Sequence, residues 1–188
     1  MTTTTGDVDV VDILTSDHEE VLQLVRDIPA ADPAGRRDMT DTVIAELMRH
    51  SVAEEMYVYP AMRKHMPDGD AAVEHDVKEH QELEEAMKVL ESADTAEPAF
   101  LDGLSHLEAI LRDHIDDEEK DQFPQLRATI PHDELVAIGK KVETAKKLAP
   151  TRPHPAAPHS ALFHKALGPG VGLVDRLRDT LTGRSKNT

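Results

Sequence analysis

The amino-acid sequence predicts an all-α protein, most simply an up-down four-helix bundle with short loops. Apolar residues recur three and four positions apart along several long stretches, which is the period of an amphipathic helix. Proline and glycine interrupt the chain between those stretches. Runs of β-branched residues with a two-residue alternation, which are typical of strands, are missing.

The first two helices are expected in the first third of the chain. One runs from about Asp9 to Ile28, because its apolar residues share one face and Pro29 follows its end. The next begins near Pro33, since proline fits the first turn of a helix, and Pro60 kinks or ends it. Its inward positions follow steps of four and three residues: Val43, Leu47, His50, Glu54 and Tyr57.

Three further helices complete the expected body. A third follows Gly69 and ends near Asp94. A fourth opens near Pro98 and continues through Glu118, again with inward residues at alternating steps of three and four. A shorter fifth segment runs from about Pro131 to Leu148. We therefore expect four long helices and one additional short helix.

Charge and proline content divide the chain into two regions. Residues 149–188 carry a local charge of +4, so residues 1–148 carry −20 of the net −16. Prolines crowd the junction, at positions 150, 153, 155 and 158. We expect a bundle with its fifth helix over 1–148, and a proline-rich basic tail with a short amphipathic helix over 149–188. The tail is expected to pack on the acidic body, or alternatively to bind a protein partner or a membrane surface.

Composition excludes several classes of protein. The absence of cysteine removes disulfides, thiolate metal sites and cysteine nucleophiles. The net charge of −16 argues against nucleic-acid binding. No apolar run is long enough to span a membrane, and the N-terminal residues do not resemble a signal peptide. A cytoplasmic protein without integral membrane association is the expectation.

The most informative feature is an internal repeat. His50 begins the string HSVAEEMYVYP and His114 begins HIDDEEKDQFP, and both read His-x3-Glu-Glu-x3-aromatic-Pro. His18 and His80 lie upstream of them in the similar strings DHEEV and EHQEL. The chain therefore consists of two helix pairs that carry the same polar residues at corresponding positions.

These polar residues occupy positions that the helical period assigns to the bundle interior. An ionised glutamate buried without a partner costs several kcal/mol, and a buried imidazole needs both nitrogens satisfied. A histidine and a glutamate four residues apart project from the same helix face. A positive ion among them would compensate the cluster. The expected metal ligands are His18, His50, Glu54, His80, His114 and Glu118.

The donor set indicates which metal to expect. Four imidazoles and two carboxylates, with no sulfur, suit two first-row ions better than one. Non-haem iron is favoured, and manganese or zinc is less expected. A single zinc ion would need only three or four of these ligands.

These six residues on successive helices resemble the hemerythrin family, specifically the bacterial hemerythrin-like HHE cation-binding domain, over roughly residues 10–125. The resemblance implies a four-helix bundle with an oxo- or hydroxo-bridged di-iron centre. It also implies terminal histidine ligands, bridging Glu54 and Glu118, and chemistry with O2, peroxide or NO.

One position departs from that family. Oxygen-carrying hemerythrins have a second histidine four residues before the single ligand of the third helix, and here that residue is Asp76. His75 lies about 140° around the helix from His80 and is poorly aimed at the same point. Asp76, Tyr57 or water is expected to fill the gap. Reversible O2 carriage is therefore less expected than peroxide or redox chemistry.

Other residues near the ligands receive simpler interpretations. We expect Tyr59 and Phe123 to close the end of the bundle as core residues. His65, His106 and His132 fall off the inward stripe and are expected at the surface. Acidic neighbours of the ligands are expected mainly on solvated faces, with hydrogen bonding to imidazole as the minority alternative: Glu19, Glu55, Glu82 and Glu119.

Two functions follow from this interpretation. The first is a di-iron protein that reacts with peroxide, O2 or NO, with catalase- or peroxidase-like activity in which the metals carry the chemistry. The alternative is a module that binds O2, NO or iron as a carrier, store or sensor without turnover. Enzyme activity is not decided by the sequence, because it offers no separate acid–base pair.

Overall fold

The computed structural model describes residues 8–149 and 151, and all of their regular structure is helical. The prediction of an all-α protein is confirmed for this part of the chain. The expected amphipathic helix of the tail lies outside the described residues. No helix among the described residues combines the length and apolar character needed to cross a membrane.

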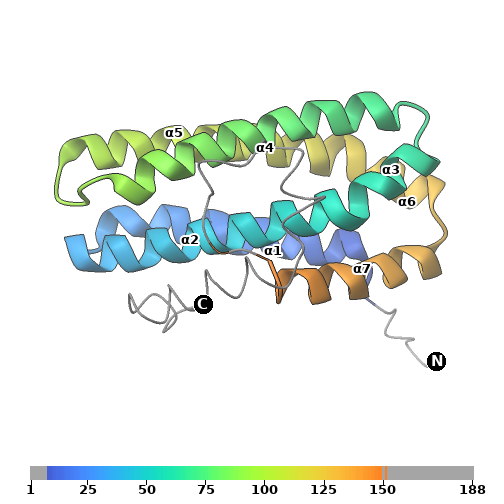
Figure 1. Cartoon of the computed structure of the whole chain (residues 1–188), viewed down its shortest axis with the longest axis horizontal. Coiled ribbons are helices and arrows are strands. Elements are labelled where there is room, and N and C mark those ends of the chain that lie inside the picture. The colour runs from blue at the N-terminus through green and yellow to red at the C-terminus, as the bar shows by residue number, and fades with distance from the viewer. Residues whose placement is uncertain (1–7, 150, 152–188) are drawn as a thin grey trace.

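Four long helices run side by side along the molecule (Figure 1). They are α1 (Val10–Asp27), α2 (Pro33–Ala53), α4 (Gly69–Ser92) and α5 (Pro98–Asp117). A short 3-10 helix, η1 (Ile28–Ala30), follows α1. The helix starts follow from local chemistry, because the Asp9 carboxylate accepts a hydrogen bond from the Asp12 amide and the Asp32 carboxylate accepts one from the Gly35 amide.

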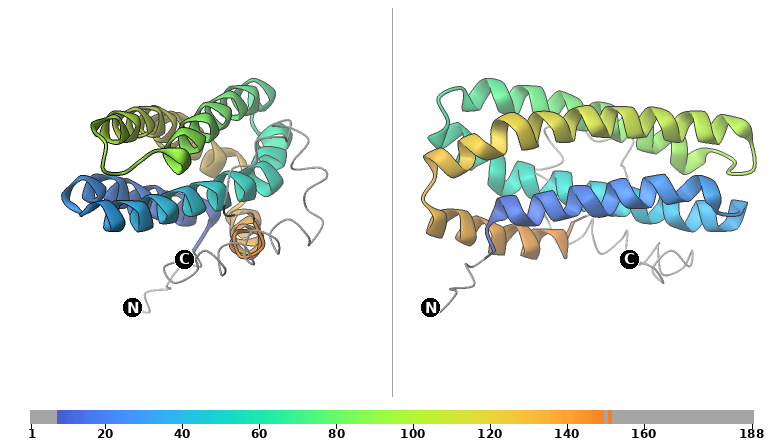
Figure 2. Two further views of the ribbon diagram at one scale, coloured as in Figure 1. Left: turned by 60° about the vertical axis from the view of Figure 1, so that its left-hand side comes forward. Right: turned by 180° about the vertical axis from the view of Figure 1, so that it is seen from behind.

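The shorter helices gather at one end of the molecule and along one side (Figures 1 and 2). Helices α3 (Tyr59–His65) and α6 (Phe123–Thr129) continue the lines of α2 and α5. Helix α7 (His132–Lys146) turns back and packs along the outside of α1 and α2. It covers that pair of helices, whereas α4 and α5 have no corresponding cover among the described residues.

Two π-helical turns join the long helices to their extensions. The segment η2 (Glu54–Val58) links α2 to α3, and η3 (Glu118–Gln122) links α5 to α6. The amides of Tyr59 and Phe123 donate to the carbonyls of Glu54 and Glu118, five residues back. The next residue in each case is a proline, which has no amide hydrogen to donate. Pro60 therefore follows a widened turn, and the chain continues in helix beyond it.

The hydrophobic core consists of two clusters on either side of the buried histidines. One includes Leu14, Val58 and Leu126 and lies toward α3, α6 and α7. The other includes Ile44 and Leu90 and lies toward the opposite end of the long helices. The polar layer between two apolar clusters is the part of the molecule that packing alone does not explain.

Candidate metal centre

All six residues expected as metal ligands are buried in the layer between the two clusters. Each long helix contributes one histidine: His18 from α1, His50 from α2, His80 from α4 and His114 from α5. Glu54 and Glu118 are the first residues of the two π turns. Donor atoms of His50, Glu54, His114 and Glu118 all lie within 4.8 Å of one another.

Each glutamate lies between imidazoles of two different helices. Glu54 Oε2 is 3.2 Å from His50 Nε2 and 3.4 Å from His80 Nε2. Glu118 Oε2 is 3.2 Å from His18 Nε2 and 3.6 Å from His114 Nε2. The two groups meet where His18 Nε2 and His50 Nε2 approach to 3.1 Å. The two groups have the same composition, one carboxylate and two imidazoles, and each combines residues from both halves of the internal repeat.

Several of these buried atoms have no hydrogen-bond partner. They are both carboxylate oxygens of Glu54, Oε2 of Glu118 and Nε2 of His114. A buried polar atom without a hydrogen bond costs free energy, and such atoms in one place indicate an additional group. Oxygen and imidazole nitrogen donors that face one point fit a metal cation. The residues present therefore fit the site that the sequence predicts.

A carboxylate holds each histidine from the side away from the centre. Imidazole Nδ1 lies 2.8 Å from Glu119 for His18, 3.2 Å from Asp17 for His50, 3.2 Å from Glu55 for His80 and 2.8 Å from Glu79 for His114. When Nδ1–H donates a hydrogen bond to a carboxylate, the neutral imidazole keeps Nε2 unprotonated and able to bind a metal ion. The hydrogen bond also fixes the orientation of the ring.

The interpretation of Glu55 and Glu119 as solvated residues is wrong, because both hydrogen-bond histidines of the centre. Glu19 and Glu82 are exposed, as expected. Asp17 and Glu79 were missing from the predicted site. A sequence signal was available for them, since each immediately precedes one of the ligand histidines.

Aromatic rings also contact two of the histidines. Tyr59 stacks on His80 with ring centroids 5.6 Å apart, and Phe123 stacks on His18 at 5.8 Å. The Tyr59 hydroxyl lies 3.2 Å from His80 Nε2. These two aromatic residues thus belong to the walls of the centre as well as to the core.

The structure places Tyr57 elsewhere. Its ring packs against the core cluster near α7, with the Lys141 ammonium 6.0 Å from the ring centroid. The expectation that Tyr57 fills a gap in the centre is therefore corrected, because Tyr59 is the tyrosine whose hydroxyl contacts a ligand histidine.

Charges within the metal-free centre compensate one another. Burial disfavours a charged imidazole and lowers the pKa of a histidine. At His50 the carboxylates of Glu54 and Asp17 outweigh this effect, and at His80 the carboxylates of Glu54 and Glu55 outweigh it. The pKa of each of these two histidines is raised to about 10. Burial alone would raise the pKa of Glu54, but the two imidazoles hold it well below its usual range. Protons therefore supply the positive charge that a metal would supply when bound.

Asp76, the residue at the position of the missing histidine, is fully buried on α4. Its Oδ1 accepts a hydrogen bond of 2.6 Å from Gln122, while Oδ2 has no partner. Burial, together with the charges of Glu118 and Glu54, raises the pKa of Asp76 to about 7. The structure thus places an unpartnered carboxylate oxygen beside the centre, one helical turn from His80.

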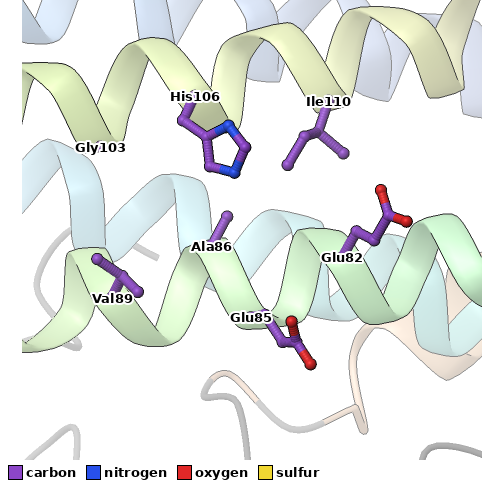
Figure 3. A pocket seen from close by; sticks show the side chains of 7 residues that line it. All are labelled: Glu82, Glu85, Ala86, Val89, Gly103, His106 and Ile110. Atoms are coloured by element: carbon purple, nitrogen blue, oxygen red, sulfur yellow. The ribbon is translucent and has the colours of Figure 1, made fainter.

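A small cavity and a larger groove lie near the long helices. The small cavity, between the long helices, has room for about one water molecule. Its lining includes His18, His50 and His114, with apolar walls from Val21, Leu47, Leu83 and Leu111. The larger groove, between α4 and α5, contains exposed His106 and none of the six residues (Figure 3). Only very small molecules fit beside the centre in this conformation.

The remaining histidines lie away from the centre. His106 and His132 are exposed, as expected, and His65 is partly exposed and pairs with Glu134. His75 is also exposed and pairs with Glu79 and Asp117. The tail histidines lie outside the described residues.

Comparisons with known proteins agree with this geometry. The family model of the hemerythrin HHE cation binding domain matches residues 9–126. A protein of Schizosaccharomyces pombe, named as an uncharacterized hemerythrin-like protein, is 31% identical over 176 residues, which cover 92% of this chain and 86% of that protein. A DNA nickase of Nostoc sp. is 24% identical over 141 residues, which cover 74% of this chain and 40% of the nickase.

A solved structure supports the fold. The crystal structure of a hemerythrin HHE cation binding domain-containing protein from Mycobacterium kansasii matches with a TM-score of 0.66 and 24% identity, covering 89% of this chain and 98% of the other. With its buried histidine and glutamate cluster, its helical fold and the match of the family model, the chain belongs to the hemerythrin HHE cation-binding domain family.

Proposed function

We propose that the six buried residues hold two iron ions and that this centre turns over hydrogen peroxide in a catalase- or peroxidase-like reaction, with O2 and NO as further ligands. The observation that carries the proposal is the convergence of four imidazoles and two carboxylates in one buried layer. Among their inward atoms, both oxygens of Glu54, Oε2 of Glu118 and Nε2 of His114 lack a hydrogen-bond partner. Two carboxylates, each between two imidazoles, would give enough donors to hold two ions. Nitrogen and oxygen donors without sulfur favour iron over zinc, and manganese is the second choice.

An iron pair, when bound, supplies the electron transfers that oxidise one peroxide to O2 and reduce another to two waters. The protein holds the imidazole nitrogens in place through the four carboxylates behind them, so the ligands need no reorganisation during the reaction. The apolar walls of the small cavity exclude larger substrates. The centre is thus accessible only to very small molecules.

Polar groups beside α4 favour peroxide chemistry over reversible carriage of O2. The Tyr59 hydroxyl lies next to His80, and Asp76 with Gln122 lies one helical turn away. Peroxide turnover requires protons to move, and the Asp76 carboxylate, whose pKa is raised to about 7, can hold and release them. Burial raises the pKa of the Tyr59 hydroxyl, so this group stays protonated and can donate a hydrogen bond. Asp76 in place of an imidazole also adds negative charge, which favours the more oxidised state of iron.

The test begins with metal analysis of protein purified without oxygen, followed by optical spectra on adding O2 and then H2O2. We expect about two irons per chain and release of O2 from peroxide. The variant combining Glu54→Ala and Glu118→Ala should lose the metal, and Glu19→Ala with Glu82→Ala is the matched control. Full metal content in the first variant would overturn the site. An iron-loaded protein that forms a reversible O2 adduct over many cycles and releases no O2 from peroxide would instead support the carrier alternative.

A further inference from the structure

A second group of potential metal donors lies at the surface between α4 and α5. His75 Nε2 is 3.0 Å from Asp117 Oδ2 and 3.2 Å from Glu79 Oε1. The side chains of His75 and Asp117 are 55% and 49% exposed, and that of Glu79 is 15% exposed. We call these three residues the surface triad. It contains one imidazole and two carboxylates, and none of the six residues of the centre.

The triad has the dimensions of a divalent cation site. Nitrogen and oxygen donors lie about 2.0–2.2 Å from a bound first-row ion, so donors roughly 3 Å apart can share one ion. Neither carboxylate forms an ion pair with a lysine or arginine among the described residues. Three protein donors at an exposed position leave the remaining coordination positions to water. Such a site binds weakly and exchanges rapidly, which suits transfer rather than storage.

One residue joins the triad to the buried centre. Glu79 directs Oε1 toward His75 at the surface, and its Oε2 accepts a hydrogen bond of 2.8 Å from Nδ1 of His114. The other nitrogen of His114 is one of the inward atoms without a partner. A single carboxylate and a single imidazole ring therefore connect the surface triad with the interior.

The internal repeat shows that this exposed group of donors is specific to the α4 and α5 side of the molecule. The residue that corresponds to Glu79 is Asp17, which holds His50 in the same way. Asp17 also pairs with the Lys146 ammonium of α7 at 2.5 Å, so a cation of the protein already occupies its outer side. The positions that correspond to His75 and Asp117 are apolar Ile13 and Ala53, which pack in the core cluster next to α7.

We propose that His75, Glu79 and Asp117 form a surface site that captures a divalent transition-metal cation, such as Fe²⁺, and loads it into the buried centre between α4 and α5. This inference rests on the proposed metal-binding function of the six residues. On the α1 and α2 side, Lys146 of α7 already pairs with Asp17, the residue that corresponds to Glu79. The triad should therefore control how fast the centre is filled and have little effect on how much metal it finally holds.

The first experiment measures how fast the metal-free full-length chain takes up Co²⁺ when the chain is in excess over the cation. The absorbance of the bound ion monitors the uptake. The variant combining His75→Ala and Asp117→Asn should load at least about tenfold more slowly and reach the same final metal content. His65→Ala removes a different surface histidine paired with an acid and should load at the wild-type rate. Unchanged loading in the double variant would overturn the surface site while leaving the centre intact. A wild-type chain that takes up no cation would overturn the centre and the loading site together.

The second experiment tests the surface triad without the centre. In the variant combining Glu54→Ala and Glu118→Ala, one weakly bound Co²⁺ per chain should remain. Adding His75→Ala should remove that ion, whereas adding His65→Ala should leave it in place. A centre-deficient chain that binds no Co²⁺, or that keeps the ion after His75→Ala, would contradict the proposal. Thermal unfolding of each variant establishes that it is folded.

Discussion

Every imidazole of the centre depends on a carboxylate that belongs to another helix. Glu55 and Glu119 follow Glu54 and Glu118 in the sequence and hold His80 and His18. Asp17 and Glu79 each precede a histidine and hold the histidine of the next long helix. Each of these acids therefore fixes the spacing between two helices as well as the orientation of one ring. Losing one of them should weaken metal binding without removing a ligand.

Replacing Glu119 by alanine removes the carboxylate that holds His18. The variant should bind metal about tenfold more weakly, which is the lower end of the effect expected when a ligand histidine loses its hydrogen-bond partner. The effect is at the lower end because the Glu119 side chain is 36% exposed, so water can replace part of its hydrogen bond. Competition with a chelator of known affinity measures the change. Glu19→Ala makes the same chemical change at an exposed residue beside His18, and equal effects of the two variants would contradict the prediction.

Asp76→Asn replaces a buried carboxyl group by an amide that cannot ionise. The pKa of Asp76 is raised to about 7, so in the metal-free chain its ionisation opposes folding, with a cost that grows as the pH rises from about 4 to above 7. The asparagine can still accept the Gln122 hydrogen bond and does not ionise. We expect it to stabilise the metal-free chain by about 1–3 kcal/mol more at pH 8 than at pH 4. Urea unfolding at both values measures this difference, and a gain that is independent of pH would contradict it.

The π turns explain why the sequence predicted the wrong tyrosine. An α-helical period from Glu54 puts Tyr57 on the inward face, which is why it was a candidate. The turn from Glu54 to Val58 contains an additional residue, because the Tyr59 amide reaches back five residues rather than four. The inward position then passes to Tyr59. Pro60 indicated an irregularity, but proline alone does not distinguish a kink, a helix end and a π turn.

At the scale of elements, the junction of α3 and α4 depends on one glycine. A Cβ atom at Gly69 would lie 2.2 Å from the carbonyl oxygen of Met62, which is backbone and cannot move away cheaply. Gly69→Ala should therefore lower the free energy of unfolding by about 1–3 kcal/mol or more. Gly103→Ala is the control, since its nearest neighbour is a Leu90 methyl at 3.3 Å and alanine favours helix by about 1 kcal/mol. Thermal unfolding of both variants checks this, and similar stabilities would contradict it.

For the whole molecule, folding and metal binding should depend on pH in opposite directions. The pKa values of His50 and His80 rise from about 6.5 in the unfolded chain to about 10 in the folded, metal-free chain. Their contribution to stability is complete below about pH 6.5 and is lost as the pH rises toward 10. A metal competes with the same protons, so its apparent affinity rises over this range.

The increase in Tm caused by metal should therefore grow between pH 6 and pH 9. Calorimetry of the metal-free and metal-loaded protein at several pH values measures it. In the variant combining Glu54→Ala and Glu118→Ala, the metal-free stability should depend less on pH, because the charges that retain the protons are gone. A constant increase in Tm across the range would contradict the prediction.

The repeat explains how much of the molecule could be predicted from the sequence. Helical periodicity and paired His-x3-Glu strings identify the helices and the six buried residues, because the period carries through each α-helix. The same rules do not identify Glu55 or Asp17 as partners of histidines, since their contacts cross between helices. The place of α7 along α1 and α2 also depends on tertiary packing, which no local pattern specifies.

The two halves of the internal repeat do not surround the centre with equally polar residues. Near α4, His80 has Tyr59 and the Asp76–Gln122 pair as neighbours. The corresponding positions in the other half are Phe123, Leu14 and Val58, all buried and apolar. If two metal ions are held there, as we propose, these unequal surroundings would give the two ions different reduction potentials.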